Sequence, residues 1–174
     1  MEEHNIVYDK NIMEFIAVCN EFAGFLEKSR SIPRNDFINT SLKILPLLYL
    51  KAGLLPNVEL PENIDIEKFV DENRWTFIQN SVAYILADMD EYVEVQDMSI
   101  DRSLDYLNIS LSELFADIYQ DIGDLICSFK LFDDNITAAA VYECKNNFES
   151  YWGIRLIILL ENLHKIKFLK SENV

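Results

Sequence analysis

Three aspartates stand in one short segment, DIYQDIGDL, at positions 117, 121 and 124. Because an α-helix has 3.6 residues per turn, these spacings line the side chains up along one side of a helix. Such a row of carboxylates could coordinate a hard divalent cation or exchange protons with a substrate. The apolar residues of the same segment, however, form a stripe with the acids on its flank. We therefore predict that Asp117 and Asp124 face solvent, and that only Asp121, at the boundary of the stripe, can reach an inward partner.

Other metal-binding residues are scarce. A carboxylate-bridged di-metal site needs two Glu-x-x-His spacings, and the sequence contains one, Glu161 to His164. The other histidine, His4, lies close to the start of the chain. We therefore predict no metal, with a mononuclear Ca²⁺ or Mg²⁺ site on the carboxylates as the alternative.

The familiar catalytic and cofactor motifs are also missing. The sequence has no glycine-rich phosphate loop, no Gly-x-Ser-x-Gly and no His-Glu-x-x-His. Its cysteines, Cys19, Cys127 and Cys144, form no Cys-x-x-Cys pair. We predict no cofactor and favour a protein without catalytic activity, although other kinds of enzyme are not excluded.

One cation stands where an apolar residue is expected. The segment IRLIILL makes the last predicted helix apolar nearly all round, and Arg155 lies on its inward stripe. A buried guanidinium without an anion would cost several kcal/mol. We therefore expect Arg155 to form a structural ion pair, with the anion of a ligand as the alternative partner.

Counting along the two helices that precede and follow the turn near residues 133–134 suggests the partner of Arg155. Asp121 would be offset by about 13 Å at a rise of 1.5 Å per residue, whereas Glu113 would be level with the arginine. Glu113 is therefore the preferred partner. Glu14 and Glu21 of the first helix are further alternatives.

Aromatic side chains add a second kind of candidate. Tyrosine and tryptophan combine a large apolar body with a polar group that needs an outlet when buried. Four of them could line a pocket, although core packing is the commoner use: Trp75, Tyr119, Tyr151 and Trp152. The candidate ligand-binding set is Tyr119, Asp121, Trp152, Arg155 and His164, with no catalytic residue assigned.

The elements that must position these residues are helical, because apolar residues recur with a helical period almost throughout the chain. Pro46 should kink or break the second helix near residue 45. Ser110 and Glu113 form a capping box at the start of the helix that carries the aspartates. Alternation at residues 92–95 is too short to predict a strand. We predict helices over 9–29, 36–54, about 75–89, 110–131 and 135–166, a short helix after Asp65, a loop over 55–65, a connector over 88–103, and Asp134 as the cap of the last helix.

The fold class that follows is all-α, a bundle of five to six mostly antiparallel helices in a single domain, 1–174. The formal net charge of −15 argues against nucleic acid and against anionic membrane surfaces as partners. The longest apolar stretch is far shorter than the ~20 residues of a membrane span, and no signal peptide is visible. The unpaired cysteines are typical of the reducing cytoplasm.

Three segments resemble a bacterial family of domains of unknown function: NDFINTSLKILPLLYLKAGLLP, ELFADIYQDIGDL and YWGIRLIILLENLH. The resemblance spans nearly the whole chain. It implies a helical single-domain protein with no established activity, and it draws attention to Tyr119, Gln120, Asp121, Trp152, Gly153 and His164 without assigning them a role.

Two functional hypotheses follow. The first is a non-enzymatic helical protein that acts through protein contacts with an unidentified partner, or as a homodimer through the apolar last helix. The second is a small-ligand or metal-binding helical protein, an enzyme in one version, that uses the carboxylate and tyrosine row with Arg155 or His164.

Overall fold

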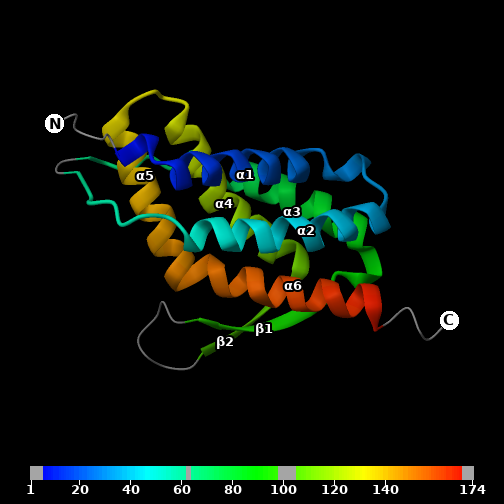
Figure 1. Ribbon diagram of the computed structural model, residues 1–174. Helices are drawn as coiled ribbons and strands as arrows, with labels where there is room; N and C mark the ends of the chain where they lie inside the picture. The colour runs from blue at the N-terminus through cyan, green and yellow to red at the C-terminus, as the bar shows by residue number, and fades with distance from the viewer. Residues whose placement is uncertain (1–5, 62–63, 98–104, 170–174) are drawn as a thin grey trace.

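The computed structural model describes residues 6–61, 64–97 and 105–169 (Figure 1). Within these ranges the chain forms a helical bundle with one small hairpin, which confirms the predicted all-α class. The helices are α1 (Lys10–Glu27), α2 (Arg34–Gly53), α3 (Glu72–Leu86), α4 (Leu111–Phe129), α5 (Asp134–Asn147) and α6 (Gly153–Phe168). The strands are β1 (Tyr92–Asp97) and β2 (Asp105–Ser110).

The bundle is built around α4. In Figure 1, α1, α2 and α6 lie side by side, α3 and α4 lie behind them, and α5 crosses one end. α4 contacts α1, α3, α5 and α6, and most of its residues are buried. Any polar side chain of α4 therefore has to find its partner on another element of the chain.

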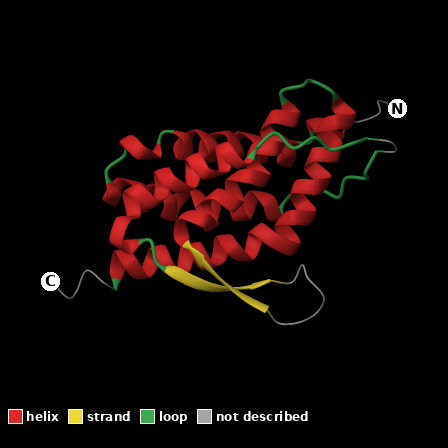
Figure 2. Ribbon diagram, turned by 180° about the vertical axis from the view of Figure 1, so that it is seen from behind, coloured by secondary structure: helices red, strands yellow, loops and turns green. Residues whose placement is uncertain are grey.

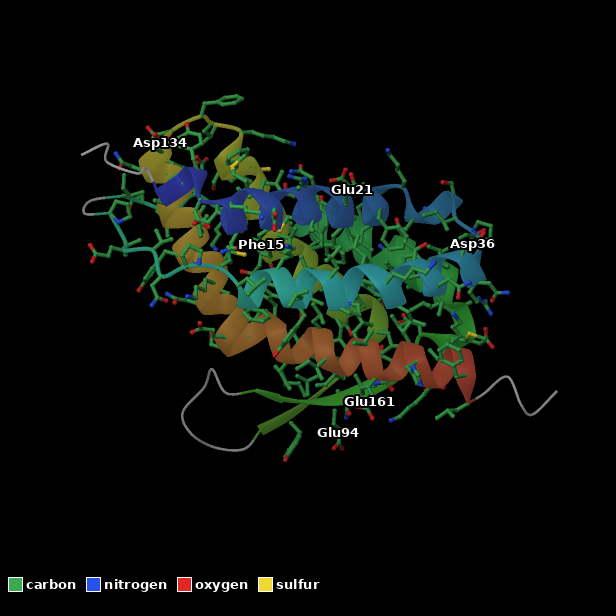
Figure 3. All side chains as sticks on the ribbon, in the orientation of Figure 1. Phe15, Glu21, Asp36, Glu94, Asp134 and Glu161 are labelled. Carbon is green, nitrogen blue, oxygen red and sulfur yellow. The ribbon has the colours of Figure 1, made fainter. Side chains whose placement is uncertain are left out.

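The predicted apolar stripes do form the core. Phe15 of α1 lies inside the bundle in Figure 3. All seven residues that make the apolar stripe of this helix in the sequence are buried: Ile12, Phe15, Ile16, Cys19, Phe22, Ala23 and Leu26. The acidic residues labelled in that figure lie at the periphery and are exposed: Glu21, Asp36, Glu94, Asp134 and Glu161. None of the described helices is long and apolar enough to cross a bilayer.

The helix that carries the aspartates begins where the sequence predicts. The Glu113 N–H donates to Ser110 Oγ at 3.2 Å, and the Ser110 N–H donates to Glu113 Oε2 at 2.7 Å. Each side chain thus satisfies a backbone N–H that has no partner within the helix. The cap of α5 is Asp133, which accepts from two backbone N–H groups, so the assignment to Asp134 is wrong by one residue.

The predicted last helix, 135–166, is wrong as a single element. A π-helical turn, Phe148–Trp152, separates α5 from α6, and Figure 1 shows the chain changing direction there. Gly153 follows the turn, and a Cβ at this position would collide with the Phe148 carbonyl oxygen. By contrast, α2 is a single helix that continues through Pro46. Of the two predicted effects of this proline, a kink or a break, the break does not occur.

Two other segments differ from the prediction. Tyr92–Asp97 pairs with Asp105–Ser110 as an antiparallel hairpin, in which Val93 faces Ile109 (Figure 2). The connector prediction is therefore wrong over β1, while its residues 98–103 lie outside the described part. Residues 64–71 form no helix, contrary to the prediction of a short helix after Asp65. This 64–71 segment instead packs against α4.

Candidate functional site

Asp117 lies inside the bundle and forms an ion pair with Arg155. Arg155 Nε donates to Asp117 Oδ2 at 3.1 Å, and Trp75 Nε1 donates to Asp117 Oδ1 at 3.1 Å. The side chains of Asp117 and Arg155 are only 13% and 4% exposed. The prediction that Asp117 faces solvent is therefore wrong. The carboxylate joins α4 to both α3 and α6.

The predicted partners of Arg155 are also wrong. Glu113 serves its own capping box, and Asp121 lies one turn further along α4 than Asp117. The count along the helices failed because it assumed one uninterrupted last helix, whereas the chain changes pitch and direction at the π-helical turn. The expectation of a structural ion pair is confirmed with a different acid.

Tyr151 completes the surroundings of this ion pair. The Arg155 guanidinium lies 3.6 Å from the centre of the Tyr151 ring, and Nη1 donates to the Tyr151 carbonyl oxygen at 3.3 Å. Burial raises the pKa of Asp117 despite the lowering effects of Trp75 and Arg155. Burial likewise raises the pKa of Tyr151 to about 12. Burial thus disfavours the charged forms of both the Asp117 carboxyl and the Tyr151 hydroxyl.

Asp121 has an inward partner, as predicted, and the partner is on α5. Asn147 Nδ2 donates to Asp121 Oδ1 at 2.5 Å. Burial raises the pKa of Asp121 to about 6, against the lowering effects of the hydrogen bond from Asn147 and of the Lys68 charge.

Asp124 is buried, so the prediction of a solvated side chain is wrong here too. Its Oδ1 accepts from the backbone N–H groups of Phe69 and Val70, both at 2.8 Å. Its Oδ2 lies 3.6 Å from Lys68 Nζ, which also lies 2.9 Å from Glu143. The carboxylate therefore fastens the 64–71 segment to α4.

Each of the three carboxylates joins α4 to other elements of the chain through hydrogen bonds. Asp117 joins it to α3 and α6, Asp121 joins it to α5, and Asp124 joins it to the 64–71 segment. The part of the chain that the structure describes contains no group of three His, Cys, Asp or Glu residues able to hold a metal ion. The spacing along α4 thus gives three separate contacts instead of one shared ligand set.

Tyr119 lies on a different side of α4 from the three aspartates, and its side chain reaches a surface hollow. Its hydroxyl donates to Glu27 Oε1 at 2.7 Å and accepts from Arg74 Nη2 at 2.9 Å. Burial first, and then Glu27, raise the pKa of Tyr119 to about 12. Glu27, Arg74 and Tyr119 border two adjoining hollows of about 240 and 380 Å³. They form the polar group that we take as the candidate site.

The sequence does not single out Glu27 and Arg74 as site residues, because neither belongs to a motif or stands among unusual neighbours. Both are ordinary charged residues of amphipathic helices, and they come together only when α1 and α3 pack on α4. Tyr119 was found because a large side chain with a polar tip is itself a signal.

The other candidates lie elsewhere. Trp152 is fully buried, and its Nε1 donates to the Cys144 carbonyl oxygen at 3.1 Å. His164 is exposed on α6, with its ring centre 4.7 Å from that of Phe168. Asp121 borders a separate cavity of only about 10 Å³ beside Lys68. Of the five candidates, Tyr119 is the one at the hollows.

Comparison with known proteins agrees with the fold. The family model of a domain of unknown function, DUF5063, matches residues 6–169. The crystal structure of protein BF1032 from Bacteroides fragilis, a structural genomics target, is similar, with 37% sequence identity and a TM-score of 0.82. The match covers 94% of this chain and 96% of that one. No curated protein matches the sequence.

Proposed function

The chain belongs to the DUF5063 family, and from that premise we propose that it is a non-enzymatic cytoplasmic protein that acts through protein contacts, with a second copy of itself as the partner. The free cysteines support the reducing compartment. The proposal rests on the surface of α2.

The outer face of α2 exposes large apolar side chains. Leu47 and Leu50, with Leu54 at the C-cap of this helix, are 42%, 56% and 46% exposed. Their spacing of three and four residues places them on one side of the helix. Exposed apolar residues grouped in this way mark contact surfaces more often than single ones do.

Charge favours a second copy on this face. The chain carries 30 acidic residues, yet residues 37–58 contain none and include Lys43 and Lys51. Two molecules of net charge −15 repel each other least where their surfaces lack acids. A twofold contact brings the same face of each molecule together, so α2 would meet α2.

The buried acids support the non-enzymatic part of the proposal. Catalytic carboxylates must reach a substrate, whereas Asp117 and Asp124 are buried and engaged with other elements of the bundle. The ligand-binding alternative keeps one supporting observation, the hollows beside Tyr119.

Light scattering coupled to size-exclusion chromatography at micromolar concentration tests the proposal. We expect a dimer for the natural sequence and a folded monomer for Leu50→Glu. Leu131→Glu is the matched control, because Leu131 is 49% exposed at the far end of α4 and should leave the dimer intact.

Two results would overturn this assignment. A natural protein that is strictly monomeric at micromolar concentration removes the second copy as partner. Dissociation by Ile157→Glu but not by Leu50→Glu would place the contact on α6, where Ile157 is 44% exposed. Circular dichroism establishes that each variant is folded.

A further inference from the structure

The hollow of about 240 Å³ lies between α1 and α4, beside Arg74 of α3. Gly24 forms part of its wall on α1, and a Cβ added at Gly24 would meet no atom within 4 Å. Space next to this glycine is therefore open. Through Glu27, Arg74 and Tyr119 the hollow adjoins the second one of about 380 Å³, which is bordered by the half-exposed Phe77.

The charge of the smaller hollow is opposite in sign to that of the molecule. Arg74 and Lys130 line it with one acid, Glu27, while the whole chain carries −15. Glu27 is already engaged, since its Oε1 accepts from Tyr119 and lies 3.6 Å from Arg74. Lys130 is exposed at the end of α4 and joins none of the ion pairs found among the described residues.

The guanidinium of Arg74 is held in place with donor capacity left over. Nη2 is fixed by the Tyr119 hydroxyl at 2.9 Å. Among the residues that the structure describes, Nη1 donates only to Cys127 Sγ at 3.7 Å, and a thiol sulfur is a weak acceptor. An oxyanion at this position would replace the sulfur with a charged acceptor, which makes a much stronger hydrogen bond.

We propose that this hollow binds a small organic oxyanion, a carboxylate or a phosphate monoester, which Arg74 and Lys130 hold from two sides. Tyr119 and Glu27 act as positioning residues, because their contacts fix the direction of the guanidinium. The body of the ligand lies against Gly24 and extends toward Phe77. This site is independent of the α2 surface and does not rest on the proposed dimer.

Titration of the full chain with succinate and with inorganic phosphate, at constant ionic strength and pH 7, tests the proposal by ¹⁵N NMR. We expect saturable shifts of the Gly24, Gly123 and Lys130 amides. Arg74→Gln should weaken the affinity by about tenfold or more, as expected for the loss of a charged hydrogen bond. Lys130→Gln should weaken it to a smaller extent because that side chain is exposed.

A second pair of variants leaves the polar group intact. Gly24→Phe fills the hollow and should abolish the saturable shifts. Gly53→Phe is the matched control, because a Cβ at Gly53 also meets no atom within 4 Å and this glycine ends α2. It should bind as the natural protein does, and its oligomeric state is measured separately.

The outcomes separate the possibilities. Saturation with succinate alone assigns a carboxylate group to the ligand, and saturation with inorganic phosphate alone assigns a phosphate group. Shifts that fail to saturate with either probe overturn the site. Unchanged binding by a folded Gly24→Phe protein overturns it as well, whatever the oligomeric state proves to be.

Discussion

Asp117, Asp121 and Asp124 share one spacing pattern on α4, yet their surroundings give them different properties. Asp117 faces a cation and an indole N–H, Asp121 faces an amide, and Asp124 faces two backbone N–H groups. A carboxylate is stabilised by donors of this kind and destabilised by burial. The balance differs at each position, so residue type and spacing alone could not predict the chemistry.

The ion pair between Arg155 and Asp117 can be tested by removing one partner. Arg155→Leu leaves the Asp117 carboxylate buried without its cation, and we expect unfolding to become easier by about 3–5 kcal/mol. Urea denaturation at pH 7 measures the change. Adding Asp117→Asn to this variant removes the unpaired charge and should recover part of the loss. A loss below about 1 kcal/mol in the single variant would contradict a buried pair.

Asp121 should make the stability of the protein depend on pH. Its pKa is about 6 when folded and 3.8 without the fold, so the folded state favours the neutral acid. The resulting stabilisation is complete below pH 3.8 and is lost as the pH rises through about 6. By pH 8 the charged form lowers the free energy of unfolding by roughly 2–3 kcal/mol.

Asp121→Asn keeps the side chain neutral and tests this dependence. We expect the variant to melt at a higher temperature than the natural protein at pH 8, with a difference that shrinks as the pH falls below 6. Glu21→Gln, at an exposed position of α1, is the control. A difference in melting temperature that stays constant with pH would contradict the assignment.

Among the secondary-structure elements, α4 is the one on which the others depend, and the 64–71 segment shows how closely they fit. A Cβ added at Gly123 would lie 2.5 Å from Val70 Cγ2, which belongs to this segment. Val70 is 3% exposed and has little room to move. The segment can pack against α4 only because residue 123 has no side chain.

Gly123→Ala should therefore destabilise the protein, by about 1–3 kcal/mol, although alanine is the better helix former. Chemical denaturation measures this change. Gly24→Ala is the matched control, since its Cβ meets open space, and it should be neutral or stabilising by up to about 1 kcal/mol. Combining Gly123→Ala with Val70→Ala should relieve the collision, and an equal loss in both backgrounds would argue against it.

Elements that depend on local signals could be predicted, and those that depend on distant contacts could not. The buried stripe of α1 and the capping box of α4 are fixed by neighbouring residues, and both are found as expected. β1 needs its partner strand to be recognised, and Phe148 of the π-helical turn packs against the distant Tyr49 of α2. Asp124 appears solvated until the 64–71 segment is placed over it.

At the scale of the whole molecule, charge and apolar surface are divided unevenly. Acids dominate the sequence, α2 has an acid-free stretch, and two cations line one hollow. The net charge and the acid-free stretch could be read from the sequence, but the exposure of that stretch and the meeting of two cations at one hollow required the packing of α1, α2, α3 and α4. The proposed dimer contact lies on the acid-free stretch of α2, and the proposed oxyanion site lies at the hollow that the two cations line.

The hydrogen bonds between Asp124 and the 64–71 segment should slow the exchange of two backbone amide hydrogens with the solvent. Loop amides normally exchange fast, because local opening exposes them at little cost in free energy. The N–H groups of Phe69 and Val70 are held by a buried carboxylate, so their release requires the segment to detach from α4. In deuterium oxide these two amides should be protected as strongly as helical ones, and Asp124→Ala should make them exchange rapidly while α4 itself stays protected. A stretch without regular structure would then rank among the slowest-opening parts of the molecule.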